Sequence, residues 1–465
     1  MITKFVNRKL ELKFFNERYR NKGHEFIPVY GRRRVGKTEL LLNFIKDKEA
    51  IYFLSTSGSK KDNIEKFKAT AKHIIDLDFI KDDWEEIFKY LAGKVKNRLI
   101  IVIDEFPYLL ETEKGLSSIF QRIFDLYLKD SSIFLILCGS SLSMMHKEVL
   151  DYRAPLYGRR TGQAEIKSLE FKDVIKFFKK PFEETIGIYS VCGGVPAYLG
   201  EFLEDKPLKS LIYDKIMSKS SFLREEVPFI LREEFRDPRV YLTILSSLSL
   251  GHRKLGEIMN YCGFKDKTSI TPYLRNLESL QYIRREISIT EKINSKKGLY
   301  FINDNFFNFW FRVVRRNIEL FDRNIKFDDD IIREFEHIIS FVFEDICRQF
   351  ILEHMRNLFD EVGRQWGKTK YGEKGKNTYE IDITALNEKT KEILFGECKW
   401  QENVNSGEVV KELAEKTKNV DWENEKRKES YAVFAKSFSK RIDEFGGKKV
   451  YCFDLRDLEK VFKKI

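Results

Sequence analysis

Four short apolar runs in the first 140 residues, separated by polar segments of helical spacing, predict buried β-strands. The runs are 26–30, 51–54, 99–103 and 133–138. Strands that are apolar throughout and alternate with helices are typical of a parallel sheet covered on both faces. We therefore predict an α/β fold for this part of the chain.

The pattern becomes helical and amphipathic from about residue 170 to 250. One predicted helix face is marked by Phe171, Val174, Ile175, Phe177 and Phe178. Residues 251–302 then predict two short helices, a third that begins near Lys267, and a β-ribbon formed by 282–289 and 299–302. This order of elements is typical of a winged helix-turn-helix.

A charged helix over 312–330 is expected to connect these elements to a new unit. That unit begins with a helix over 331–354 and continues with three strands, a helix, a strand, a helix and a final strand that ends at Phe453.

The first apolar run leads directly into a phosphate-binding motif. Residues 31–38 match GxxxxGK[ST] and consist of Gly31, Arg32, Arg33, Arg34, Val35, Gly36, Lys37 and Thr38. In such a loop the glycines let backbone N–H groups turn toward phosphate oxygens, and the following helix presents its N-terminus. Lys37 is expected to reach the phosphates of ATP and Thr38 to be a ligand of Mg²⁺.

The third and fourth apolar runs end in polar residues that fit the same site. The third run ends in Asp104 and Glu105, which would hold Mg²⁺ through water and polarise the attacking water, respectively. The fourth is followed by Ser140 and Ser141, of which one could sense the γ-phosphate. Serines after a strand are also ordinary turn residues.

Composition agrees with an ordered multidomain protein. The 465 residues carry a net charge of +11 and are 42% hydrophobic, which excludes a disordered chain. Residues 1–50 hold 13 basic and 6 acidic side chains, and residues 251–300 hold 10 and 5. The first excess lies around the nucleotide loop, so the second carries the case for a polyanionic partner such as DNA.

The basic residues of 251–300 would neutralise DNA phosphates if this segment is a winged helix. They are Arg253, Lys254, Lys265, Lys267, Arg275, Arg284, Arg285, Lys292, Lys296 and Lys297. A winged helix can instead brace domains or bind protein, and the sequence leaves that alternative open.

A predicted hairpin near the C-terminus gathers a second set of chemically suggestive residues. Strands 379–383 and 393–399 would bring Asp382 close to Glu397, and strand alternation puts Glu397 and Lys399 on one face. Two carboxylates suit Mg²⁺ or Mn²⁺, and the ammonium of Lys399 would activate water or stabilise developing charge.

Several motifs together resemble a known family. GRRRVGKT, VIDEFPYL, CGSS, PLYGRR and GGVPAYL look like those of archaeal and bacterial STAND-like P-loop ATPases related to AAA+ proteins, over nearly the whole chain. The resemblance implies a helical lid and a winged helix after the ATPase core, with Pro196 beside the nucleotide. It also implies that Arg159 or Arg160 contacts phosphates, in cis or in trans, unless both only solvate a loop.

The C-terminal set resembles the PD-(D/E)XK nuclease motif, although Ile381 replaces the leading proline of that motif. The resemblance adds Glu344, on the preceding helix, as a further metal ligand. The predicted domains are therefore an ATPase core (1–185), a helical lid (186–245), a winged helix (246–312), a connector (313–330) and a nuclease-like domain of restriction-endonuclease type (331–465).

The six cysteines form no CxxC pair, and no signal peptide or membrane-spanning run is visible, so we expect a cytoplasmic protein without a membrane anchor. The leading hypothesis is an ATPase whose nucleotide state controls DNA binding and metal-dependent DNA cleavage. The alternative is a STAND-like switch that ATP gates, in which the C-terminal domain binds without cleaving. That switch would act by self-association or through a protein partner.

Overall fold

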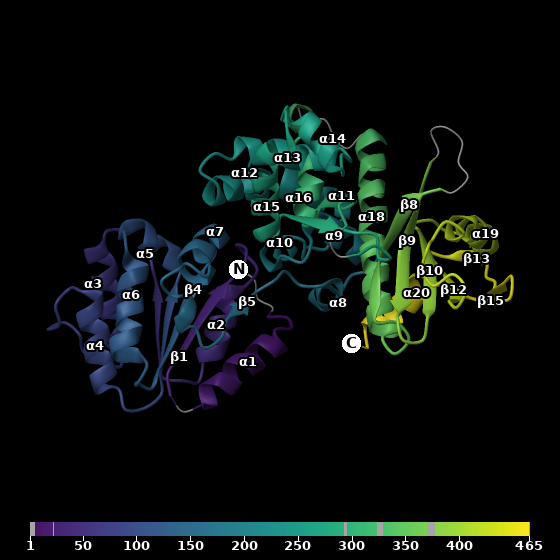
Figure 1. Cartoon of the computed structure of the whole chain (residues 1–465). Helices are drawn as coiled ribbons and strands as arrows, with labels where there is room; N and C mark the ends of the chain where they lie inside the picture. Colours follow the sequence, from purple (N-terminus) through teal and green to yellow (C-terminus); the bar gives the residue numbers. More distant parts are fainter. Residues whose placement is uncertain (1–4, 22, 293–294, 323–328, 370–376, 465) are drawn as a thin grey trace. The chain divides into compact units, whose positions relative to one another are not determined.

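The computed structural model describes residues 5–21, 23–292, 295–322, 329–369 and 377–464. The chain divides into two compact units. Unit 1 comprises Met1–Leu169 together with Val195–Gly200 and Arg232–Arg236, and unit 2 comprises the remainder. Figure 1 labels many of the helices and strands of both.

Unit 1 is built on a five-stranded parallel sheet, which confirms the prediction for the N-terminal part. Its strands, in spatial order, are β2 (Ala50–Leu54), β3 (Leu99–Asp104), β4 (Ile133–Gly139), β1 (Glu25–Tyr30) and β5 (Ala164–Glu165). All four predicted apolar runs are strands. Since the strands are parallel, β1 and β3 end at the same edge of the sheet, on either side of β4.

Helices cover both faces of this sheet (Figure 1). On one face, α1 (Lys9–Arg20) and α2 (Lys37–Ile45) place Phe15 and Phe44 against Ile27 and Val102 of the strands. The other face carries α3 (Lys60–Ala71), α4 (Trp84–Lys94), α5 (Phe106–Thr112) and α6 (Leu116–Ile123), whose aromatic rings contact one another and Phe53 of β2. The buried rings hold the strand ends in place around the loops that follow them.

Most of unit 2 before residue 303 is helical. Its longer helices are α9 (Phe182–Cys192), α12 (Phe222–Glu234, whose last turn belongs to unit 1), α13 (Arg239–Ser249), α14 (Leu255–Tyr261) and α15 (Lys267–Ser279). An antiparallel ribbon of β6 (Ile283–Glu286) and β7 (Leu299–Ile302) follows.

The helix that begins at Lys267 and the ribbon are confirmed, but the pair of short helices predicted after residue 251 is wrong. The described chain has a single helix, α14, between 251 and Lys267, because α13 ends at Ser249. Gly251, with φ of +92°, adopts the left-handed conformation that terminates α13.

The C-terminal part of unit 2 contains a separate six-stranded mixed sheet. Its spatial order is β14 (Glu444–Phe445), β15 (Lys448–Phe453), β12 (Lys428–Ala435), β10 (Glu392–Lys399), β9 (Thr378–Asn387) and β8 (Glu361–Lys368). Helices α18 (Asp329–His354) and α19 (Ser406–Thr417) pack against β9 and β10. The predicted sequence of one helix, three strands, a helix and a strand is confirmed as far as β12.

Two other predicted helices are wrong. The segment between β12 and β15 forms the short strands β13 (Phe438–Lys440) and β14, because Gly446 and Gly447 turn the chain back in the left-handed conformation. The last helix, α20 (Leu455–Phe462), instead follows β15, where the Asp454 carboxylate caps its first amides. The connector is broken at 315–317, α17 covers Ile318–Asp322, and the rest of the connector up to residue 328 lies outside the described residues.

Within the described residues, no helix combines the length and the apolar character needed to cross a membrane.

Candidate functional site

The loop 31–36 joins β1 to α2 and has the backbone of an anion-binding turn. Gly31 has φ of +154°, and a Cβ there would lie 2.2 Å from the carbonyl oxygen of Ile166, so no side chain fits. Arg34 (φ 66°) and Gly36 (φ +92°) are left-handed, which folds the loop back on itself before α2 begins at Lys37. Such alternation of backbone conformation turns successive N–H groups toward one side.

Lys37 is buried at the base of this loop. Its ammonium donates to the carbonyl oxygens of Gly31 at 2.8 Å and Arg32 at 2.9 Å, and burial lowers its pKa. Neutral carbonyls are weaker partners for an ammonium than a phosphate oxygen. The ammonium therefore lies where a bound phosphate would be its stronger acceptor.

Thr38 and Asp104 meet across the sheet edge. The Thr38 hydroxyl donates to Asp104 Oδ2 at 2.7 Å, and the Tyr52 hydroxyl donates to the same oxygen at 2.5 Å. Burial, together with the charge of Asp104, raises the pKa of Tyr52. A hydroxyl and a carboxylate side by side are hard oxygen donors that fit Mg²⁺. Tyr52 did not emerge from the sequence, where it is one aromatic residue within an apolar strand.

Glu105 lies beside this pair in a left-handed backbone conformation with φ of 54°. Its carboxylate accepts hydrogen bonds from the Ser140 hydroxyl at 2.8 Å and the Ser140 amide at 3.3 Å. Of the two serines singled out in the sequence, Ser140 thus reaches Glu105, whereas the Ser141 hydroxyl contacts Ser143 at 3.2 Å.

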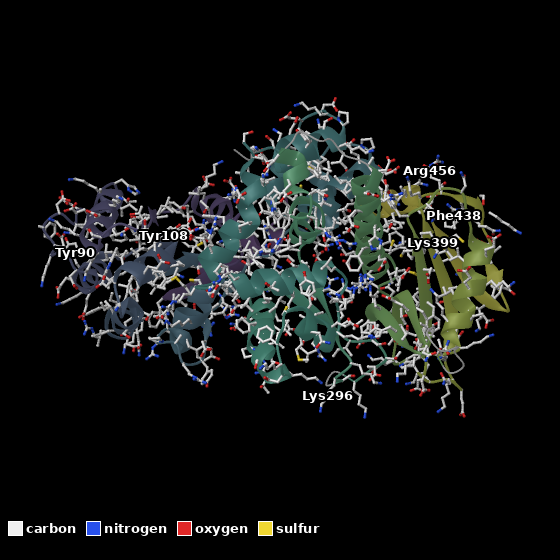
Figure 2. All side chains as sticks on the ribbon, turned by 90° about the horizontal axis from the view of Figure 1, so that it is seen from above. Tyr90, Tyr108, Lys296, Lys399, Phe438 and Arg456 are labelled. Atoms are coloured by element: carbon white, nitrogen blue, oxygen red, sulfur yellow. The ribbon has the colours of Figure 1, made fainter. Side chains whose placement is uncertain are left out.

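Arg33 and Pro196 also lie at the loop. The Arg33 guanidinium donates to the hydroxyl of Tyr108, labelled in Figure 2, at 3.1 Å and to Glu233 at 3.0 Å. The side chain of Pro196 lies 4.0 Å from the position that a Cβ on Gly36 would occupy. The sequence motif GGVPAYL thus reaches the loop through its proline.

The two arginines of the PLYGRR motif have partners of their own. Arg159 forms a two-pronged ion pair with Asp125, at 3.1 and 2.9 Å, and Arg160 stacks on the Tyr157 ring at 4.5 Å. A phosphate contact by Arg159 would require this ion pair to open.

In unit 2, the predicted partners Asp382 and Glu397 lie on neighbouring antiparallel strands, β9 and β10. The backbone N–H of Cys398 donates to Asp382 Oδ2 at 2.9 Å. The Glu397 carboxylate is held by Lys416 of α19, at 2.9 and 3.1 Å, and more distantly by Lys399, at 3.4 Å. Lys399, at the end of β10, is labelled in Figure 2. Lys416 was missed at the level of sequence, because one lysine on an amphipathic helix carries no pattern.

Glu344 of α18 also lies near Asp382 but is paired with a cation. Its carboxylate accepts a hydrogen bond from Arg364 at 2.5 Å. Burial, followed by the charges of Glu344 and Glu397, raises the pKa of Asp382 to about 8. This environment favours the protonated form of Asp382.

These carboxylates do not make a metal site as they lie. Across the described part of the chain, no three His, Cys, Asp or Glu residues are grouped closely enough to hold a metal ion. Arg364 and Lys416 neutralise Glu344 and Glu397, which is the role that a cation would otherwise have. The donors have the right chemistry for Mg²⁺, but their arrangement does not fit it.

Several basic residues of 251–300 are engaged inside unit 2. Arg284 pairs with Glu286 at 2.6 Å and with Asp345 of α18 at 3.4 Å, while Arg253 stacks on Phe301 at 4.6 Å. The segment that follows β6 also contacts β8, because the Ile289 amide donates to the Arg364 carbonyl at 3.0 Å. Arg253 and Arg284 thus contact residues of unit 2 itself.

A second group of basic side chains in this segment is exposed. It comprises Lys254, Lys265, Lys267, Arg275, Lys292, Lys296 and Lys297, of which Lys254 and Lys297 pair with Glu257 and Glu291. Lys296 points outward from the ribbon in Figure 2. Any phosphate contact made by this segment would come from these exposed residues before Arg253 and Arg284.

Residues 5–202 match a family model described as an ATPase domain predominantly from Archaea, and residues 310–416 match one described for archaeal and bacterial proteins of unknown function. An uncharacterised protein of Methanocaldococcus jannaschii is 38% identical over 462 residues, which cover 97% of this chain and 99% of that protein. A short ATP-binding protein of the same organism is 46% identical over 48 residues, or 10% of this chain and 81% of that protein.

Among solved structures, a Walker-type ATPase of Pyrococcus abyssi is similar in fold. The TM-score is 0.53 at 20% sequence identity, and the match covers 66% of this chain and 96% of that one.

Proposed function

Since this chain belongs to the family of proteins whose ATPase domain is found predominantly in Archaea, we propose that it binds ATP with Mg²⁺ at the loop 31–38 and hydrolyses it there. The domain is a P-loop ATPase domain, and we propose which of its residues bind the nucleotide and which hydrolyse it. The observation that carries it is the 2.7 Å hydrogen bond between Thr38 and Asp104, directly beside the buried ammonium of Lys37.

Lys37 and the loop amides would bind the phosphates. On nucleotide binding the Lys37 ammonium exchanges the carbonyls of Gly31 and Arg32 for charged phosphate oxygens. The backbone N–H groups from Arg32 to Gly36 surround the same phosphates. Pro196 lies beside the loop at Gly36.

Thr38 and Asp104 would hold the magnesium ion, Thr38 directly and Asp104 through water. Bound there, Mg²⁺ would neutralise charge that develops on the phosphates. Tyr52 keeps the Asp104 carboxylate in position through its own hydrogen bond.

Glu105 would accept a proton from the attacking water. Its carboxylate is held by the Ser140 hydroxyl and amide at one oxygen, Oε2, so the other oxygen has no bond to Ser140. A fixed carboxylate directly after Asp104 suits general-base assistance to hydrolysis.

The test compares Lys37→Ala and Glu105→Gln in purified full-length protein. We expect Lys37→Ala to lose nucleotide binding, and Glu105→Gln to bind ATP but turn it over at least about a hundredfold more slowly. The exposed substitution Lys81→Ala should match the unmodified protein. Undiminished turnover in Glu105→Gln would remove that residue from the mechanism.

For unit 2 we propose that α13 to β7 form a winged helix whose DNA-binding surface comprises the exposed residues Lys265, Lys267, Arg275, Lys292 and Lys296. What supports this is their exposure, combined with the internal use of Arg253 and Arg284. Nucleotide state in unit 1 would then control DNA binding. The finer boundaries (186–245 as lid, 246–312 as winged helix, 313–330 as connector) belong to this proposal.

Salt dependence tests the DNA proposal. Duplex affinity should fall steeply with salt, and replacing Lys267 and Arg275 together should lower the slope by about 2, because each phosphate contact contributes roughly one unit. Lys81→Ala again provides the control. A slope that the double substitution leaves unchanged would place DNA elsewhere or exclude it.

A second candidate function, DNA cleavage by a nuclease-like domain over 331–465, is favoured by one observation. Asp382 of β9 and Glu397 of β10 lie on neighbouring antiparallel strands, and Glu344 of α18 lies near Asp382. Because the carboxylates do not fit a metal as they lie, no catalytic step follows from them, and Lys399 stays a predicted catalytic residue.

Asp382→Asn decides between this candidate and the STAND-like switch with a non-cleaving C-terminal domain. Duplex, single-stranded and branched DNA would be incubated with Mg²⁺ or Mn²⁺. Cleavage that Asp382→Asn abolishes supports a nuclease. ATP-dependent assembly or partner binding without cleavage supports the switch.

A further inference from the structure

Arg8 is a buried arginine in unit 1 that directly precedes α1. Its side chain bridges two segments of the chain that are distant in sequence. The guanidinium donates to the carbonyl oxygen of Val35 at 2.9 Å, to that of Lys167 at 2.7 Å, and to the Glu11 carboxylate at 3.0 Å. Only 7% of Arg8 is exposed, although most arginines in proteins reach solvent. Burying an arginine in this way requires that its nitrogens be paired, and here three acceptors surround it.

The backbone around Arg8 is also unusual. Asn7 (φ 59°) and Arg8 (φ 69°) are both left-handed, a conformation that side chains other than glycine rarely adopt. Such a conformation persists only where surrounding contacts enforce it. This left-handed turn directs the Arg8 side chain toward the phosphate-binding loop.

The two carbonyls accept from the same guanidinium nitrogen, Nη2, so Arg8 joins the segment that follows β5 to the phosphate-binding loop. Val35 is in its second half, and Lys167 follows Ile166, whose carbonyl oxygen excludes any side chain at Gly31. The segment 166–167 therefore holds the loop twice, at its start through the close approach to Gly31 and near its end through Arg8.

The peptide bond after Val35 transmits this contact to the loop interior. In a planar trans peptide the C=O of one residue and the N–H of the next point in opposite directions. Because the Val35 carbonyl is fixed toward Arg8, the N–H of Gly36 is fixed on the opposite side. No cis peptide occurs in the described chain.

We propose that Arg8 is a positioning residue that preorganises the phosphate-binding loop by holding the Val35–Gly36 peptide in its anion-binding orientation. The inference rests on the proposed binding of nucleotide at this loop. Arg8 touches no reacting atom, so it acts on the affinity for nucleotide more than on the chemical step. Without it the loop samples other orientations, and part of the binding free energy is lost in ordering it.

The experiment compares Arg8→Ala, Arg8→Lys and the matched control Arg20→Ala, an exposed arginine in the last turn of α1. For Arg8→Ala we expect KM for ATP and Kd for ADP to rise by about tenfold or more, while kcat stays within about threefold. Arg8→Lys should lie between, because both carbonyls accept from the single nitrogen Nη2, which one ammonium can partly replace, whereas the separate bond from Nη1 to Glu11 is lost. Arg20→Ala should match the unmodified protein.

Hydrogen exchange separates loop ordering from general destabilisation. In ligand-free Arg8→Ala, the amides of 33–37 should exchange faster, while those of the central strand β4 keep their protection. If Arg8→Ala does not fold, Arg8→Lys provides the test. It should show a raised KM for ATP while the amides of β4 keep their protection.

The possible results distinguish this inference from the proposed function. If Arg8→Ala and Arg8→Lys bind nucleotide as tightly as the unmodified protein does, the role of Arg8 is overturned but the proposed function is not. A parallel loss of kcat and of β4 protection assigns Arg8 to folding and also overturns it. Failure of the unmodified protein to bind nucleotide overturns the proposed function instead.

Discussion

Lys416 donates to both carboxylate oxygens of Glu397, at 2.9 and 3.1 Å. It lies on α19, 19 residues after Glu397 in the chain. Lys399, the lysine that the E-x-K pattern singles out, lies on the same strand as Glu397 and is more distant, at 3.4 Å. The closer and two-pronged ammonium is the one that neutralises this nearly buried carboxylate.

We therefore predict that Lys416→Ala destabilises unit 2 more than Lys399→Ala does. The expected losses are about 1 kcal/mol for Lys416→Ala and less than about 0.5 kcal/mol for Lys399→Ala, since Lys416 is partly exposed and its ion pair is screened. Denaturant unfolding followed by tryptophan fluorescence measures both. Equal losses, or a larger one for Lys399→Ala, would contradict the ranking.

Asp382 should make stability depend on pH in an unusual direction. Its pKa is raised to about 8 by burial and by the neighbouring carboxylates Glu344 and Glu397, whereas an aspartate in an unfolded chain has a pKa of about 3.9. Between these values the folded protein keeps a proton that the unfolded chain has released. The contribution of Asp382 is therefore most favourable below pH 4, decreases as the pH rises toward 8, and is constant above it.

Asp382→Asn removes this titration and keeps an oxygen that can accept the Cys398 amide. Relative to the unmodified protein, we expect its free energy of unfolding to improve progressively from pH 5 to pH 8, by on the order of 1 kcal/mol for each step of one in pH. Asp443→Asn, an exposed substitution in the same unit, is the control. Denaturant unfolding at several pH values measures the difference. A difference that stays constant over this range would show that Asp382 is ionised in the folded protein.

Sequence patterns predicted the elements that depend on local composition. Buried parallel strands are apolar along their whole length, so β1 to β4 were visible, and the GxxxxGKT signature located the loop and its lysine. The approach of Asp382 to Glu397 followed from the hairpin. Each of these features is determined by residues that lie close together in the sequence.

The remaining features depend on contacts between distant segments. Tyr52, Arg8 and Lys416 each act on a residue from another element, and nothing in their own neighbourhood marks them. The charge of Arg284 looks the same in the sequence whether it faces DNA or pairs with Asp345 of α18. The helix predicted before the final strand is wrong because the double glycine at 446–447 makes a hairpin there, and α20, which follows that strand, was not predicted.

The hydrogen bonds from Ser140 to Glu105 predict a moderate effect on catalysis. Ser140→Ala removes the hydroxyl bond at 2.8 Å but keeps the amide bond at 3.3 Å, so the carboxylate is loosened without being freed. We expect kcat for ATP hydrolysis to fall by about three- to tenfold, with Kd for ATP unchanged, because Ser140 orients the catalytic group. Ser141→Ala, which removes only the contact with Ser143, is the matched control. A change in Kd without a change in kcat would assign Ser140 to nucleotide binding.

Gly31 tests whether the close approach of the loop to Ile166 is essential. A Cβ at Gly31 would lie 2.2 Å from the Ile166 carbonyl oxygen, and the backbone φ of +154° is itself rarely adopted by a residue with a side chain. Since the obstacle is backbone and not the end of a flexible side chain, either the loop or the segment 166–167 must move. We predict that Gly31→Ala destabilises unit 1 by more than about 2 kcal/mol and abolishes nucleotide binding.

Gly158→Ala is the control for Gly31→Ala, because nothing in the described structure lies within 4 Å of a Cβ at that position. Its thermal midpoint and its Kd for ADP should stay close to those of the unmodified protein. Tight ADP binding by Gly31→Ala would mean that the loop reaches its anion-binding conformation without the support of residue 166. The second attachment through Arg8 would then suffice to hold it, and the double substitution Gly31→Ala with Arg8→Ala should lose the binding that either one alone retains.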